Sequence, residues 1–173
     1  WKGKGNLKLN LSDVFFTQLE LPNPDYFLGV GGGSHTQQTA KMMLAFEEVL
    51  QKEQPDLVLV VGDVNSTIAC ALVAVKMNIP VAHVEAGLRS GDRGMPEEIN
   101  RILTDSISDY LFVTEMSGMI NLAKENVPDE RIFFVGNCMI DSLVHYQARA
   151  RQLSYSAVLP NKPAIQDQSY VLM

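Results

Sequence analysis

Residues 56–63 read DLVLVVGD, and this short stretch decides the fold. Its apolar residues continue without the alternation of a half-exposed strand, which is typical of a central parallel strand covered by helices on both sides. Gly62 and Asp63 end the run, and a helical pattern follows over residues 66–77. A buried strand that leads directly into a helix is the repeating unit of a parallel α/β sheet.

Strands and helices alternate along most of the chain. A helix is expected from Ser34 or His35 to about Lys52, where the apolar residues have helical spacing, and Pro55 stops it. Further strands are expected at residues 80–84, 110–113 and 131–135, and further helices at residues 97–107, 115–126 and 139–151. About five strand–helix repeats predict a doubly wound, mainly parallel α/β sheet.

The two ends of the chain depart from this alternation. Residues 1–10, WKGKGNLKLN, have no sustained period, so we expect an irregular start. Residues 11–152 form the expected Rossmann-like domain. Proline-containing sequence follows, and residues 170–172 read as the beginning of another apolar strand. We therefore expect residues 153–173 to be a linker and the start of a missing C-terminal domain.

The composition argues against several classes of protein. The 173 residues fit one ordinary domain, and 46% hydrophobic and 20% charged residues are normal for a globular chain. A net charge of −6 argues against nucleic-acid binding, because phosphate backbones are held by clustered Lys and Arg. Without a membrane-length apolar run or a signal peptide, we expect a cytoplasmic protein that contacts no membrane. Cys70 and Cys138 lie in apolar segments without metal-ligand spacing, which predicts reduced, buried thiols and no metal.

Three carboxylates fall where the expected strands end. Asp63 follows the first strand, Glu85 follows residues 80–84, and Glu97 opens a helix after a turn. Ligands of open α/β sheets bind beyond these ends, so we expect the three acids to share one crevice. Singly, Asp63 and Glu97 are equally well explained as helix caps or first-turn acids. Together they favour function, because like charges in one crevice destabilise a fold that does not use them.

Basic residues accompany these acids. His83 lies two residues before Glu85 on the same face of the strand, where it either orients a carboxylate or is a hydrogen-bonded core residue, the commoner case. Arg89 and Arg101 either bind phosphate or hold the acids by charge-assisted hydrogen bonds, and we favour the second role for Arg101. His83 and Arg89 are the candidate substrate-binding residues. The glycines at 31–33 lack the P-loop and dinucleotide fingerprints, so no nucleotide cofactor is expected.

Three motifs, in this order and at this spacing, resemble the non-hydrolysing UDP-N-acetylglucosamine 2-epimerase family. They are PDLVLVVGDVNST at 55–67, IPVAHVEAGLRS at 79–90 and MPEEINRILTDSISD at 95–109. The resemblance begins at Leu11 and continues to RIFFVGNCMIDSL at 131–143. It implies a GT-B-type enzyme of two Rossmann-like domains with a cleft between them. This chain then corresponds to the N-terminal portion, truncated at both ends.

The resemblance also implies a reaction. The family interconverts UDP-N-acetylglucosamine and UDP-N-acetylmannosamine, by eliminating UDP to a 2-acetamidoglucal and adding it back with C2 inverted, without metal or cofactor. It assigns the catalytic acids to Asp63, Glu85 and Glu97, where one carboxylate removes the C2 proton and others stabilise positive charge at C1. The implied partner is UDP-N-acetylglucosamine. The implied setting is a cytoplasmic homo-oligomer that serves cell-surface polysaccharide synthesis.

The sequence departs from the family at both ends. The first strand with its GTRPE-type loop, which supplies an Arg and a Lys, and the TxHR motif with the catalytic histidine are not found in these 173 residues. We therefore expect the chain alone to be inactive and to bind substrate weakly or not at all. The alternatives are an inactive remnant or interaction module, and a hydrolysing epimerase or GT-B-type glycosyltransferase.

Overall fold

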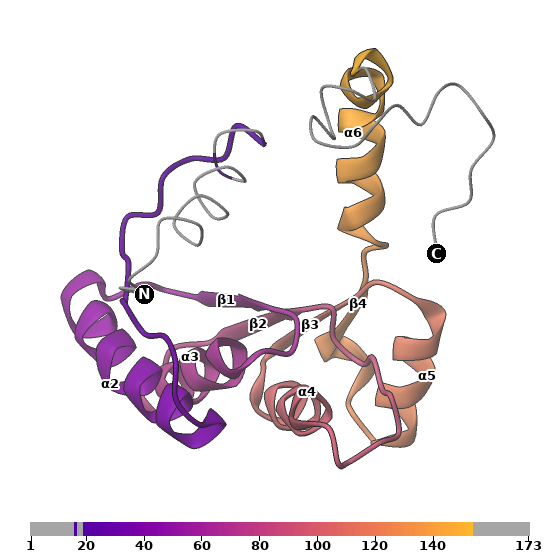
Figure 1. Ribbon diagram of the computed structural model, residues 1–173. Coiled ribbons are helices and arrows are strands. Elements are labelled where there is room, and N and C mark those ends of the chain that lie inside the picture. The colour runs from indigo at the N-terminus through magenta and orange to yellow at the C-terminus, as the bar shows by residue number, and fades with distance from the viewer. Residues whose placement is uncertain (1–15, 17–18, 154–173) are drawn as a thin grey trace. The chain divides into compact units, whose positions relative to one another are not determined.

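The computed structural model describes residue 16 and residues 19–153 (Figure 1). Its strands are β1 (Val58–Val61), β2 (Val81–Val84), β3 (Tyr110–Val113) and β4 (Ile132–Phe134). Its helices are α2 (His35–Glu53), α3 (Asn65–Lys76), α4 (Pro96–Ile107), α5 (Met116–Lys124), the 3-10 turn η1 (Asp129–Arg131) and α6 (Cys138–Gln152). The expected irregular start, and residues 154–173 of the expected linker, lie outside the described residues.

The four strands form one parallel sheet in the order β1-β2-β3-β4. Helices α3, α4 and α5 connect successive strands, and Figure 1 shows them with α2 on the same face of the sheet. Right-handed crossovers that step in one direction across a parallel sheet always put their helices on one face. The predicted α/β class and parallel sheet are confirmed, and the described strands form one wing of such a sheet.

Local signals fix the ends of α2. The Ser34 hydroxyl accepts a hydrogen bond from the Gln37 amide at 3.2 Å, and the Gln37 side chain accepts one from the Ser34 amide at 3.2 Å. This reciprocal pair is a capping box. At the other end, Gln54 adopts a left-handed φ of 45° directly before Pro55. The helix therefore begins and ends within one residue of the expected limits.

The core lies between the sheet and the helices. Helix α3 approaches the sheet closely because Ala69, Ala71 and Ala74 are completely buried. The larger core cluster consists of Leu50, Val58, Val60, Ala71, Val73, Ala74 and Val81. A second cluster beneath β3 and α5 consists of Ala86, Leu111, Val113 and Leu122. These two clusters fix the helices that reach the carboxyl edge of the sheet.

The opposite face of the sheet is apolar, and within residues 19–136 no helix covers it. In β1, Leu59 is 55% exposed and Val61 51% exposed, whereas Val58 and Val60 are buried. The strand register puts Val84, Phe112 and Phe133 in a row with Val61. This differs from the two-sided covering that the DLVLVV run predicts, because the helices of the chain up to Gly136, α2 to α5, all pack on one face of the sheet.

We expect the isolated chain to self-associate through this uncovered face, because a contiguous apolar surface favours association. Replacing Leu59 and Val61 together by Thr keeps strand propensity and removes apolar surface, so it should shift the chain towards monomer. Val64→Thr is the matched control, because Val64 is 55% exposed but lies beyond the strand. Sedimentation across a concentration series measures the shift. A wild-type chain that stays monomeric throughout contradicts the expectation.

The chain divides after Gly136 into two compact units, and α6 belongs to the second. The Asn137 side chain caps α6 by accepting a hydrogen bond from the Met139 amide at 2.9 Å. Cys70 is half-buried, and burial raises its pKa to about 11. Cys138 is exposed, so the prediction that both cysteines are buried is wrong for Cys138, which begins α6, a helix with no buried residue. No helix in the described part combines the length and apolar character needed to cross a bilayer.

Candidate active site

The first two candidate acids follow neighbouring strands. Asp63 comes two residues after β1, and Glu85 directly follows β2. The two strands are paired so that Val61 faces Val84, and the Gly62 amide donates to the Val84 carbonyl at 3.1 Å. The Glu85 Oε2 lies 3.5 Å from the position that a Cβ on Gly62 would take. The pairing of β1 with β2 therefore brings the segments that carry Asp63 and Glu85 together.

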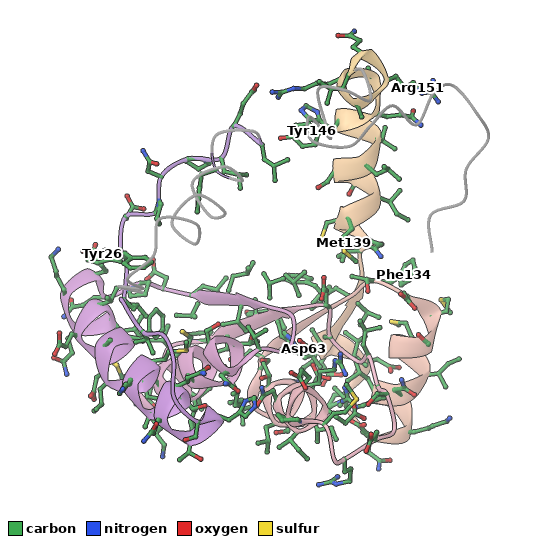
Figure 2. All side chains as sticks on the ribbon, in the orientation of Figure 1. Tyr26, Asp63, Phe134, Met139, Tyr146 and Arg151 are labelled. Carbon is green, nitrogen blue, oxygen red and sulfur yellow. The ribbon has the colours of Figure 1, made fainter. Side chains whose placement is uncertain are left out.

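Helix α4 brings the third acid to the same edge. The Asn100 side chain donates to the Asp63 carbonyl at 2.8 Å, which places the start of α4 beside the turn after β1. Arg101 forms an ion pair with the Asp63 carboxylate. Glu97 lies in the first turn of this helix and is half-buried. Figure 2 labels Asp63 beside α4, at the edge where these segments meet.

The three acids differ in their partners. Asp63 is 26% exposed and is paired with Arg101. Among the described residues, the half-buried side chains of Glu85 and Glu97 make no hydrogen bond or ion pair. The cation of Arg101 offsets part of the mutual repulsion expected of three acids, and within the described residues Glu85 and Glu97 have no such partner.

Glu98, the neighbour of the candidate Glu97, uses its carboxylate for contacts within the protein. It is 2% exposed, and its carboxylate accepts from the Ser90 amide at 2.9 Å, the Ser90 hydroxyl at 3.0 Å, the Gly91 amide at 3.1 Å and Arg101 at 3.2 Å. Burial by itself raises the pKa of a carboxyl group. Here the hydrogen bonds from Ser90, Gly91 and Arg101 outweigh it, so the pKa of Glu98 is lowered.

Glu98 therefore holds the loop between β2 and α4, and Arg101 links it to Asp63. The sequence reasoning did not give Glu98 a role of its own. Its spacing of three residues from Arg101 allows the ion pair between them, but Glu97, at four residues, has an equally suitable spacing, so the sequence does not tell the two acids apart.

His83 is a buried, hydrogen-bonded core residue. It is 0% exposed, and its Nε2 lies 2.8 Å from the Gly62 carbonyl oxygen, which only accepts hydrogen bonds. Its Nδ1 lies 2.6 Å from Asp105 Oδ1. Both ring nitrogens are thus used inside the protein. The geometry supports the core role that the sequence left open and not the expected substrate contact.

Arg89 is also committed within the protein. Its guanidinium lies 2.7 Å from Asp105 Oδ2, and it forms a two-point contact with the Glu125 carboxylate at 2.7 and 2.8 Å. Burial lowers the pKa of Arg89, but these two carboxylates more than offset it, so the pKa is raised. Arg89 therefore ties the loop after β2 to α4 and to the end of α5. Of the two roles that the sequence left open for Arg89, the geometry supports charge-assisted hydrogen bonds to carboxylates. It gives no support to the expected contact with substrate.

A cavity of about 490 Å³ adjoins the same edge. It is lined by the amino-terminal halves of α2 and α4 and by the first residue of α3, through His35, Thr36, Thr39, Ala40, Met43, Asn65, Pro96, Ile99 and Asn100. Helix N-termini carry partial positive charge, so this edge is less acidic than its carboxylates suggest. In the described part of the chain, no group of three or more His, Cys, Asp or Glu side chains is arranged to bind a metal.

Sequence comparison relates the chain to epimerases. The profile of the UDP-N-acetylglucosamine 2-epimerase family matches residues 5–173. The UDP-N-acetylglucosamine 2-epimerase of Methanocaldococcus jannaschii is 47% identical over 163 residues, which cover 94% of this chain and 44% of that protein. The UDP-2,3-diacetamido-2,3-dideoxy-D-glucuronate 2-epimerase of Pseudomonas aeruginosa is 49% identical over 143 residues, 82% of this chain and 40% of that protein.

Comparison with solved structures relates the chain to the same family of epimerases. The M. jannaschii enzyme, in a crystal structure with UDP-GlcNAc and UDP, is similar with a TM-score of 0.84 at 47% identity, over 90% of this chain and 43% of that chain. The Rickettsia bellii enzyme has a TM-score of 0.81 at 34% identity, over 92% of this chain and 42% of that chain. The chain thus spans about two fifths of the length of these relatives. The resemblance predicted from three motifs is confirmed, and the chain belongs to the UDP-N-acetylglucosamine 2-epimerase family.

Proposed function

We propose that this chain supplies the catalytic carboxylates of an enzyme that interconverts UDP-N-acetylglucosamine and UDP-N-acetylmannosamine. One observation carries the proposal. Glu85 and Glu97 are half-buried carboxylates without partners among the described residues, and they lie beside Asp63 at the carboxyl edge of a parallel sheet, where this type of fold binds ligands. The M. jannaschii relative, whose crystal structure holds UDP-GlcNAc and UDP, supports the choice of substrate.

The proposed reaction needs a base and a stabiliser of positive charge. Elimination breaks the C1–O bond to UDP and the C2–H bond, passes the C2 proton to a carboxylate, and forms the C1=C2 double bond of 2-acetamidoglucal. In the return step a UDP oxygen bonds to C1, and a protonated carboxylic acid delivers a proton to the other face of C2. A carboxylate is a weak base for a C–H bond, so the step depends on positive charge at C1 as UDP departs.

The partners of the three acids suggest how these roles are divided. Glu85 and Glu97 are free to exchange protons with the sugar. Asp63 is fixed by Arg101 and therefore suits electrostatic stabilisation of the charge at C1.

The diphosphate of the proposed substrate requires cations. Arg89 and Arg101 are both engaged with carboxylates. We propose that the other part of a full-length enzyme supplies these cations, since relatives are more than twice as long as the matched region. The family resemblance further supports a cytoplasmic homo-oligomer that serves cell-surface polysaccharide synthesis.

We expect the chain alone to form no UDP-N-acetylmannosamine. A hybrid, in which this chain replaces the matched part of the M. jannaschii relative, is expected to form it. Both proteins are incubated with UDP-N-acetylglucosamine, and the products are separated and identified by NMR. Manno product from the chain alone contradicts the need for a second part. A folded hybrid that binds UDP but forms no manno product contradicts the proposed function.

Other products of the hybrid identify the alternatives. Free N-acetylmannosamine with UDP indicates the hydrolysing reaction, and transfer of the sugar to an added acceptor indicates a glycosyltransferase. A parallel incubation with UDP-2,3-diacetamido-2,3-dideoxy-D-glucuronate tests the substrate named for the P. aeruginosa relative. Turnover of that sugar alone contradicts the proposed substrate and leaves the C2 chemistry intact.

A further inference from the structure

We propose that Asp105 of α4 is a positioning residue for the catalytic carboxylates, an inference that rests on the proposed function. Asp105 is 1% exposed and is not one of the three acids at the sheet edge. Its Oδ1 lies 2.6 Å from His83 Nδ1. Its Oδ2 accepts from the Gly87 amide at 3.0 Å and lies 2.7 Å from the Arg89 guanidinium.

The first connection runs to Glu85. Glu85 has a φ of +71°, in the left-handed region that residues with a side chain rarely adopt. The next two amides are both held: Ala86 donates to the Phe112 carbonyl at 3.2 Å, and Gly87 donates to Asp105. A strained backbone persists only where its surroundings over-determine it. Asp105 is the side chain from α4 that holds this segment in the conformation that presents Glu85.

The Gly87 end of this contact has little freedom to move. Gly87 has a φ of +78°, and a Cβ there would lie 2.5 Å from the Gly118 carbonyl oxygen. The segment after Glu85 is therefore pressed against the start of α5 on one side and hydrogen-bonded to Asp105 of α4 on the other. Loss of the Asp105 contact leaves the amide of Gly87 buried without that acceptor.

The second connection runs to the turn that carries Asp63. Asp105 holds Nδ1 of His83, and the opposite ring nitrogen donates to the Gly62 carbonyl at 2.8 Å. The imidazole thus joins α4 to the residue that precedes Asp63. One buried carboxylate fixes the segments of two candidate catalytic acids.

Asp109 offers a matched control. Its carboxylate also binds β2, because it accepts a hydrogen bond from the Val81 amide at 2.8 Å. Val81 begins β2, whereas Glu85 follows its end. Replacing either aspartate by Asn neutralises one carboxylate that is hydrogen-bonded to β2 or to the residues that follow it. Of the two, Asp105 binds at the carboxyl end of β2, where Glu85 lies, and Asp109 binds at the amino end.

The test compares Asp105→Asn with Asp109→Asn in the 173-residue chain by NMR. In Asp105→Asn we expect the Gly87 amide to exchange with D₂O roughly tenfold faster or more, because the neutral amide keeps only one of the two acceptor oxygens and lacks the negative charge that strengthens these hydrogen bonds. We also expect a changed HN–Hα coupling at Glu85 and shifted ring nitrogens at His83. Asp109→Asn should change neither the Gly87 exchange rate, nor the Glu85 coupling, nor the His83 nitrogen shifts. Unchanged signals in Asp105→Asn, or the same changes in Asp109→Asn, overturn the inference.

Two further measurements keep the test decisive. If Asp105→Asn does not fold, Asp105→Glu keeps the charge and moves the carboxylate by one methylene group, and an unchanged Glu85 and Gly87 in that variant overturns the inference. In the active hybrid, Asp105→Asn should lower kcat about 10²-fold with little change in KM, the cost of misplacing a reacting group by about 1 Å. An unmodified hybrid without activity contradicts the proposed function, while the NMR signals still decide the role of Asp105.

Discussion

Replacing Glu85 by Gln in the hybrid is expected to lower turnover of UDP-N-acetylglucosamine by about 10² or more, with the free energy of unfolding changed by less than about 0.5 kcal/mol. The substitution removes the charge and the proton-accepting oxygen but keeps the size of the side chain. No described residue pairs with Glu85, so no structural contact is lost. Product formation and urea unfolding measure the two quantities separately.

Glu97→Gln is expected to behave like Glu85→Gln, and Asp63→Asn is not. Asp63 is paired with Arg101, so its neutralisation should cost stability as well as turnover. Glu130→Gln is the control for the change in charge, because Glu130 is exposed in η1, ahead of the amino end of β4. Turnover that survives in both Glu85→Gln and Glu97→Gln contradicts their catalytic role.

Replacing Glu98 by Ala is expected to destabilise the chain by about 3 kcal/mol, the scale of breaking a buried, hydrogen-bonded ion pair. The substitution leaves the Ser90 and Gly91 amides without their acceptor and removes one of the two carboxylates that bind Arg101. Glu97→Ala is the matched control on the adjacent residue and should cost far less, since Glu97 makes no such contacts among the described residues. Equal losses of stability in the two variants contradict the assignment.

The stabilisation by Glu98 should also depend on pH. Its pKa is lowered in the folded chain from an ordinary value of 4.5, so the ionised form favours folding. The contribution is fully present above that ordinary value and is lost as the pH falls through the lowered folded value. The difference in unfolding free energy between wild type and Glu98→Gln should therefore be constant near neutral pH and shrink in acid. A difference that grows in acid contradicts this sign.

The sequence predicts the fold well because its strands are short apolar runs, each followed within two residues by Gly or Glu. The placement of Asp63, Glu85 and Glu97 follows from the same reasoning, since parallel strands end at one edge. The same reasoning did not predict that one face of the sheet lacks a layer of helices in the first unit. An apolar run such as DLVLVV shows that both faces of a strand avoid water, but which elements cover them depends on parts of the chain far away in sequence.

The contacts around the acids were beyond sequence reasoning for a similar reason. Glu97 and Glu98 are adjacent acids, and only the rotational phase of α4 decides which one faces the loop and Arg101. His83 and Asp105 are 22 residues apart, and Arg89 and Glu125 are 36 apart, so their pairing depends on strand register and helix packing. Three acids at one edge predict mutual repulsion, whereas the ion pair with Arg101 makes Asp63 an exception.

The central claim is that carboxylates of this chain move the C2 proton of a UDP-linked sugar, and proton exchange at C2 tests it most directly. The hybrid is incubated with UDP-N-acetylglucosamine in D₂O, and deuterium at C2 is measured by NMR and mass spectrometry. The account predicts deuterium at C2 in the manno product and in recovered substrate, and exchange reduced about 10²-fold or more by Glu85→Gln or Glu97→Gln. Manno product without deuterium at C2, or exchange that both substitutions leave unchanged, would contradict it.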